Sequence, residues 1–78
     1  MVCYFGVARR PDSRIGQVWV EAGGGRPTRQ YWTGVTYTTD QEAGEDIARL
    51  NRQTPIPAPD GPLEEIDLAA AIRRALQG

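Results

Sequence analysis

The chain has 78 residues, which is enough for one domain with one small hydrophobic core. One cysteine and no histidine exclude an intrachain disulfide, a histidine-containing zinc site and a four-cysteine zinc site. Nine arginines oppose ten carboxylates and give a net charge of −1, whereas a domain that binds nucleic acid mainly through phosphates usually has a strong basic excess.

The sequence also bears on where the protein acts. Its apolar runs are all shorter than the roughly 18–20 residues that a membrane span requires. The first residues have neither the basic region nor the long apolar region of a signal peptide. Together with the free thiol, these features predict a protein of the cytoplasm that has no contact with a membrane.

The first half of the sequence predicts three β-strands within residues 1–38. Residues 2–8 form an apolar run rich in β-forming residue types, and a polar turn follows at 9–13. Residues 15–21 and 29–37 both alternate between apolar and polar side chains, with three glycines between them. This pattern is typical of an antiparallel hairpin with a glycine turn.

Two registers of this hairpin fit the alternation, and a slip of one residue turns every side chain to the other face. An even-length loop pairs Val20 with Arg29, and it buries four residues together: Val18, Val20, Tyr31 and Val35. An odd-length loop, or a three-residue loop with a bulge, puts the two valines beside Gln30 and Trp32 instead. We favour the even loop, which places Trp19 and Trp32 together on the face away from the valines.

The second half predicts two helices joined by a proline-rich connector over 54–62. Thr39 and Glu42 have the spacing of a capping box, and apolar residues follow at helical intervals, so the first helix covers 39–53. Glu45 and Arg49 are spaced to form an ion pair on this helix. A second helix is predicted over 63–77, with Leu68 and Ile72 in its apolar stripe. We expect both helices to pack on the valine face.

Groups that could carry out chemistry are few, so we expect no catalytic residue, no metal site and no cofactor. The glycines at 23–25 lack the lysine and the following helix of a phosphate-binding loop, which leaves the interpretation of a hairpin turn. Cys3 has no histidine to activate it and is interpreted as a small buried hydrophobic residue. The segment Pro59–Pro62 has the spacing of a polyproline ligand, but we interpret it as a stiff connector.

The two tryptophans are the most informative residues for function. In the favoured register they lie on the face away from the core, beside Arg29 and Gln30, and exposed aromatic and arginine side chains dominate protein interfaces. The alternative is that both tryptophans belong to the core, as most tryptophans do. We therefore predict a partner-binding surface made of Trp19, Trp32, Arg29 and Gln30.

A cluster of carboxylates near the start of the first helix is the second candidate surface. Glu42, Glu45 and Asp46 lie within two helical turns, where paired carboxylates can act as acids and bases or hold Mg²⁺. Negative charge is also favoured at a helix start for electrostatic reasons alone. We include these three residues as partner-binding candidates rather than as a catalytic or metal site.

Residues 15–52 carry a resemblance to two known folds. A strand, a glycine turn, a strand ending in Thr36-Tyr37-Thr38-Thr39 and then a helix resemble the arm-binding domain of tyrosine integrases. That resemblance implies a DNA-reading sheet with Arg26, Arg29 and Trp32 near the DNA. The same elements are similar to the first hairpin and helix of the RNase H fold. That fold implies a metal-binding aspartate on its first strand, and residues 2–8 contain no carboxylate.

The predicted protein is thus a single α+β domain over 1–78, in which a three-stranded antiparallel sheet is followed by two helices packed on one face. We expect a non-catalytic protein-interaction module that acts as a small inhibitor, adaptor or accessory subunit, of the kind that phages and mobile elements encode. Its expected partner is another protein. The alternative is a small DNA-binding module of the integrase-arm type.

Overall fold

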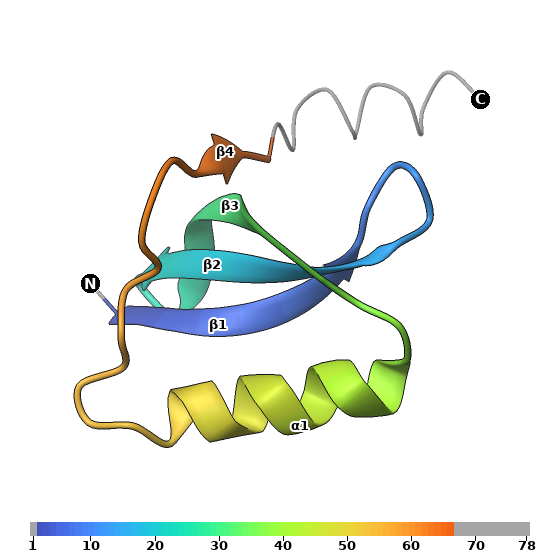
Figure 1. The fold of residues 1–78 in the computed structure, drawn as a ribbon. Helices are drawn as coiled ribbons and strands as arrows, with labels where there is room; N and C mark the ends of the chain where they lie inside the picture. The colour runs from blue at the N-terminus through green and yellow to red at the C-terminus, as the bar shows by residue number, and fades with distance from the viewer. Residues whose placement is uncertain (1, 67–78) are drawn as a thin grey trace.

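The computed structural model describes residues 2–66, which contain four β-strands and one helix (Figure 1). The elements in chain order are β1 (Val2–Arg9), β2 (Ile15–Gly23), β3 (Arg26–Tyr37), α1 (Asp40–Asn51) and β4 (Glu64–Glu65). All four strands form one antiparallel sheet in the order β1-β2-β3-β4. No helix within this part of the chain is long and apolar enough to cross a membrane.

The predicted fold, a three-stranded sheet followed by two helices, is wrong: residues 2–66 form a four-stranded sheet and one helix. The start of the predicted second helix is strand β4, which pairs with Tyr31 and Trp32 of β3. Residues 54–62 contain no helix or strand, as predicted, and they lead the chain back to the edge of β3. There the backbone N–H of Ile66 donates to the carbonyl of Gln30 at 2.9 Å. The rest of the predicted second helix, residues 67–78, lies outside the described residues.

The hairpin between β2 and β3 combines features of both predicted registers. Gly23 pairs with Arg26, so the loop is the even two-residue turn Gly24–Gly25. Both glycines have positive φ, 63° and 81°, which the favoured hairpin turn requires. A bulge then leaves Thr28 as an extra residue in β3 and shifts the pairing by one.

The bulge decides which side chains share a face. Beyond it Val18 lies opposite Trp32, and Val20 lies opposite Gln30. The expected joint burial of Val18, Val20, Tyr31 and Val35 is therefore wrong. Val18 and Val20 instead form a buried cluster with Trp32, against which Tyr4, Ala8 and Ile66 pack.

Close packing around Trp32 completes this side of the sheet. A Cβ atom added to Gly16 would lie only 2.8 Å from Cζ3 of the Trp32 ring, so the ring occupies the space that a side chain would fill. The guanidinium of Arg10 lies 5.0 Å from the ring centroid, within the range of a cation–π contact. Trp32 is thus enclosed by the sheet and by a charged side chain.

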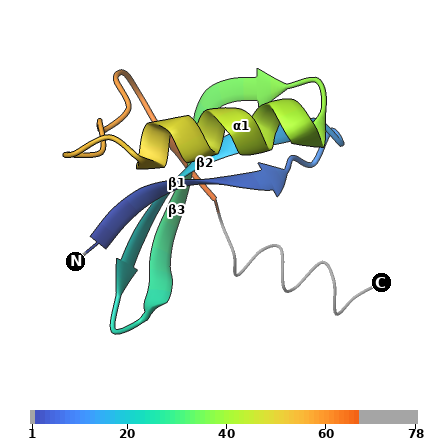
Figure 2. The same cartoon turned by 90° about the horizontal axis from the view of Figure 1, so that it is seen from below.

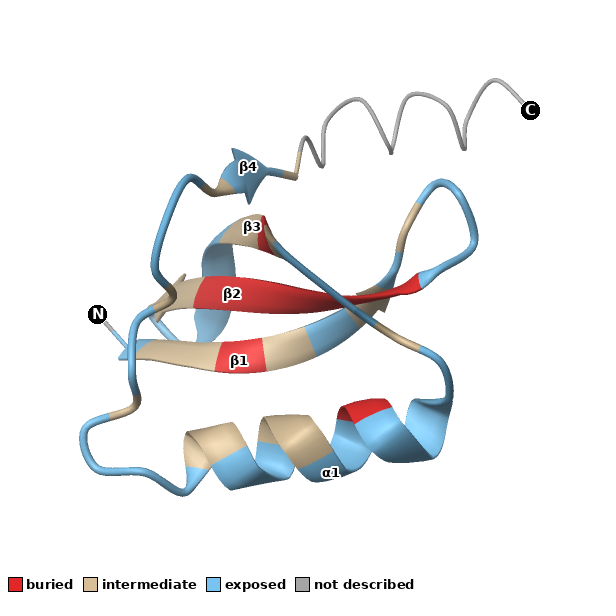
Figure 3. Ribbon diagram, in the orientation of Figure 1, coloured by how far each residue is buried: buried red, intermediate tan, exposed pale blue. Residues whose placement is uncertain are grey.

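Helix α1 covers the opposite face of the sheet (Figures 2 and 3), so the expectation that helices pack on the valine face is also wrong. Phe5 lies opposite Trp19 in the β1–β2 pairing, and their rings meet edge to face with centroids 4.9 Å apart. Ile15 and Ala43 are also buried. The side chain of Asn51, at the end of α1, accepts from the N–H of Phe5 and donates to its carbonyl, both at 2.9 Å.

The start of α1 confirms most of the predicted cap. The Thr39 hydroxyl accepts from the N–H of Glu42 at 3.1 Å. The Glu42 carboxylate reaches back to the N–H of Thr38, also at 3.1 Å, and not to that of Thr39 as predicted. The helix ends at Asn51, within two residues of its predicted end.

Thr39→Ala is expected to lower the free energy of unfolding by about 0.5–2 kcal/mol, because the N–H of Glu42 loses its hydrogen-bond acceptor. Urea melts followed by circular dichroism measure the change. Thr38→Ala is the matched control, since no hydrogen bond of the Thr38 hydroxyl is found within residues 2–66. Equal midpoints for the two variants would contradict the capping role.

Candidate functional site

The tryptophan surface predicted from the sequence does not form. Trp19 and Trp32 are only 8% and 9% exposed, and they lie on opposite faces of the sheet. Arg29 is exposed and Gln30 is half-buried, on adjacent positions of β3 that also face opposite ways. The expectation that the two tryptophans share one exposed face is wrong, because the bulge at Thr28 turns Trp32 onto the valine side.

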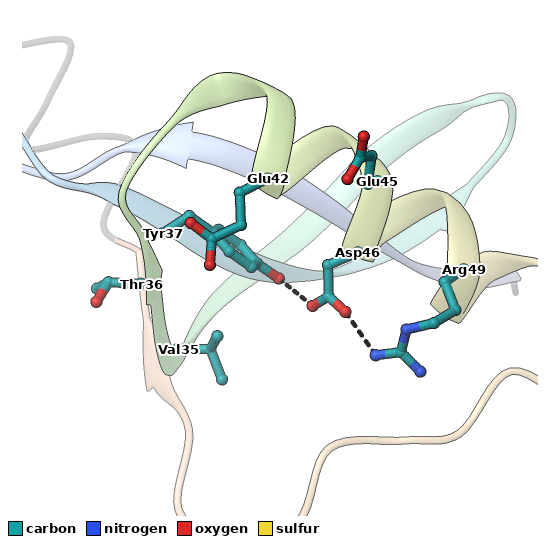
Figure 4. Close-up of a pocket in the computed structure, with 7 residues that line it drawn as sticks. All are labelled: Val35, Thr36, Tyr37, Glu42, Glu45, Asp46 and Arg49. Atoms are coloured by element: carbon teal, nitrogen blue, oxygen red, sulfur yellow. Dashed lines mark hydrogen bonds and ion pairs between the residues drawn. The ribbon is translucent and has the colours of Figure 1, made fainter.

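The second predicted group, Glu42, Glu45 and Asp46, lines a groove between α1 and the end of β3. Figure 4 shows the residues that line this groove, and its volume is about 510 Å³. We call it the α1–β3 groove and define it by its lining residues: Val35, Thr36, Tyr37, Glu42, Glu45, Asp46 and Arg49. Val35 stands on the strand side and is 43% exposed.

A neighbouring hollow extends the groove toward the proline-rich connector. It has a volume of about 360 Å³ and shares Val35, Asp46 and Arg49 with the α1–β3 groove. Its other lining is largely apolar and includes Phe5, Leu50, Pro57, Ala58 and Pro59, with Asp60 at one side. The two hollows therefore form a continuous trough from the start of α1 to the connector.

A chain of hydrogen bonds lies beneath the trough and ties the sheet to the helix. Thr33 donates to the side-chain oxygen of Gln17 at 2.7 Å, and the Gln17 amide donates to the Tyr37 hydroxyl at 2.9 Å. Tyr37 in turn donates to Asp46 at 2.6 Å, and Asp46 also accepts from Arg49. Gln17 is only 5% exposed, and both ends of its amide are satisfied. Each polar side chain of this chain of hydrogen bonds therefore has a partner within the protein.

The same contacts move the pKa values of the two titratable groups at the centre of this chain. Burial and the hydrogen bond to Asp46 raise the pKa of Tyr37 to about 12. The hydrogen bonds from Tyr37 and then from Arg49 hold the pKa of Asp46 below its usual value. At neutral pH the phenol stays protonated and the carboxylate stays ionised, which is the pairing that the hydrogen bond requires.

Tyr37→Phe is expected to lower the free energy of unfolding by about 1–3 kcal/mol, because the Gln17 amide and Asp46 each lose a partner. A pKa raised in the folded state stabilises the protein below the unfolded value near 10 and stops doing so as the pH rises to about 12. Wild-type stability should therefore fall over that window more steeply than that of the variant.

Absorbance of the phenolate at alkaline pH provides the direct check. The last tyrosine to ionise in the wild type should be absent from the Tyr37→Phe titration. If both proteins show the same last ionisation, or lose stability equally between pH 10 and 12, then Tyr37 does not have the raised pKa.

Sequence reasoning named the acidic side of the groove but not its other members. The predicted pair between Glu45 and Arg49 does not form, because Arg49 bonds to Asp46 instead. Val35 was assigned to the core. The position of Val35 and Tyr37 across from the helix depends on the path of the chain after β3. Gln17, a polar residue of β2, belongs to the same hydrogen-bonded group, but the alternation of residues 15–21 gives no sign that it is buried.

Within residues 2–66, no three carboxylate or cysteine side chains are placed to hold a metal ion. No buried side-chain nitrogen or oxygen in this part of the chain lacks a hydrogen-bond partner. Comparison with known proteins gives no family to assign: no protein-family model, no characterised protein and no solved structure matches this chain.

Proposed function

We propose that this domain is a non-catalytic, cytoplasmic protein-interaction module that binds its partner in the α1–β3 groove and acts as a small inhibitor, adaptor or accessory subunit. The observation that carries the proposal is the groove itself, where exposed Val35 lies across from Glu42 and Asp46, and Glu45 stands at the outer edge of the helix wall. The extension of the groove adds Leu50, Pro57 and Pro59 to Val35, and a contiguous apolar surface rimmed by polar groups is typical of protein interaction sites.

The state of the polar groups supports binding rather than catalysis. A general acid or base works best when its pKa is near the working pH. Tyr37 has a pKa of about 12, and the pKa of Asp46 is lowered, so both are displaced from neutrality in the direction that stabilises the fold. Their hydrogen bonds are made to each other and to Gln17, which favours a structural role beneath the groove.

The charge of the groove supports a protein partner over a nucleic acid. Its helix wall carries three carboxylates and one arginine, and that arginine is already paired with Asp46. Phosphate groups would be repelled by such a wall, whereas proteins that bind nucleic acid neutralise phosphates with basic side chains. The alternative is a DNA-binding module of the integrase-arm type. The experiment below tests it, because such a module would form crosslinks to nucleic acid.

Photo-crosslinking in the host cell tests the proposal. A photoreactive phenylalanine derivative is placed at Val35 inside the groove and, as a matched control, at Ala48, which is exposed on α1 outside the groove. We expect a discrete crosslinked protein from position 35 only. The same products from both positions, no discrete product, or crosslinks to nucleic acid would contradict the proposal.

A further inference from the structure

Two carboxylates of the groove have no ion-pair partner among the described residues. The salt bridges found within 2–66 join Arg10 and Arg14 to Asp12, and Arg49 to Asp46. Glu42 and Glu45 take part in none of them, although both are exposed and both line the groove. They are three residues apart, which makes them neighbours on the helix surface, and like charges at this spacing repel each other.

Each of these carboxylates also keeps an oxygen free for a ligand. One oxygen of Glu42 accepts from the N–H of Thr38, and one oxygen of Glu45 accepts from the Gln41 amide at 3.2 Å. The second oxygen of each has no hydrogen bond within residues 2–66. An ionised carboxylate has about four acceptor positions, so both residues can accept further hydrogen bonds without losing these contacts.

The rest of the trough adds to the negative potential. The α1–β3 groove and its extension contain four carboxylates and one arginine, which amounts to −3, whereas the whole chain has a net charge of −1. Val35 lies on the strand side of the trough, and the apolar lining continues through Leu50, Pro57 and Pro59. A complementary ligand must therefore offer positive charge and an aliphatic group side by side.

We propose that the α1–β3 groove binds a basic segment of another protein, with arginine side chains at Glu42 and at Glu45 and an aliphatic side chain against Val35. Arginine is preferred to lysine because its planar guanidinium can form two parallel hydrogen bonds with one carboxylate. This inference rests on the proposed function, since it names the partner chemistry for the same groove.

Selection from a library of random 12-residue peptides displayed on phage tests the inference with a defined probe. The full chain is the bait, and selected peptides are then synthesised and their affinities measured by fluorescence anisotropy. Three variants are compared with the wild type: E42Q/E45Q, Val35→Ser and E64Q/E65Q. The last removes two exposed carboxylates outside the groove and is the charge-matched control. Circular dichroism confirms that each variant is folded.

We expect the selected peptides to contain an arginine within two positions of a leucine, isoleucine or valine. E42Q/E45Q should weaken their binding by about threefold to thirtyfold, as expected for two partly exposed ion pairs. Val35→Ser should also weaken binding, while E64Q/E65Q should leave it within about twofold. Raising the salt concentration should weaken wild-type binding more than binding by E42Q/E45Q.

The possible outcomes distinguish a failure of this inference from a failure of the proposed function. Peptides that depend on Val35 but lack arginine, or that bind E42Q/E45Q as tightly as the wild type, would overturn the basic-segment inference and leave the groove as a binding site. If no selected peptide loses affinity in Val35→Ser, the groove is not the site, and both proposals fail.

Discussion

Trp19→Ala is expected to leave most of the protein unfolded at room temperature. The indole is 8% exposed and packs edge to face against Phe5 beneath α1. Removing a buried tryptophan side chain costs about 3–5 kcal/mol, and a core of this size rarely supplies more than about 3–5 kcal/mol in total. The loss therefore equals most of the stability that the domain can have.

Thermal melts followed by circular dichroism measure this effect, and Trp19→Phe is the matched control. Phenylalanine keeps an aromatic ring opposite Phe5 and should retain a cooperative transition at a lower temperature. A Trp19→Ala protein that melts cooperatively near the wild-type temperature would show that this side chain is not part of the core.

Val20→Asp is the second substitution expected to abolish folding. Val20 is 5% exposed and lies in the cluster with Val18 and Trp32. An ionised carboxylate there would have no partner, and the cost of burying an unpaired charge exceeds the stability of a small domain. The variant should lack both a cooperative melt and dispersed amide signals in its NMR spectrum.

Val35→Asp is the matched control, because it introduces the same carboxylate at a valine that is 43% exposed. Its carboxylate stays in contact with water, so the protein should remain folded with a change in unfolding free energy of less than about 1 kcal/mol. Equal behaviour of the two variants, whether both fold or both unfold, would contradict the observed register of β2 and β3.

Most individual elements could be predicted from the sequence because their signals are local. The apolar run of β1, the alternation of β2 and β3 and the glycines between them indicate strands and a turn. The start of α1 follows from the Thr39 cap, which acts through one hydrogen bond three residues away. Such signals fix where elements begin, but not how they face one another.

The register of the hairpin could not be obtained in this way. The alternation of β3 fits both registers, and the bulge that selects one depends on a single extra residue, Thr28, whose hydroxyl bonds to the carbonyl of Glu21 at 3.0 Å. Which side chains of the sheet are buried then depends on the face against which α1 packs. Gln17 lies on this face, where Thr33 and Tyr37 satisfy its buried amide.

Strand β4 and the groove are products of tertiary structure. Glu64 and Glu65 have low intrinsic preference for strands and resemble the acidic first turn of a helix. They pair with β3 because the connector brings them to its edge. The acidic residues of the groove were identified from sequence, but the groove exists only because Val35 and Tyr37 come to lie opposite them.

The contact between Asn51 and β1 has a consequence for association between sheets. β1 is an outer strand, and an outer strand offers unpaired backbone groups to which another chain can add. The Asn51 amide donates to and accepts from Phe5 in the way that the backbone of an adjoining strand would. The Asn51 side chain thus occupies the outer backbone groups in the middle of β1. A strand of another protein could pair along β1 only by first displacing the end of α1.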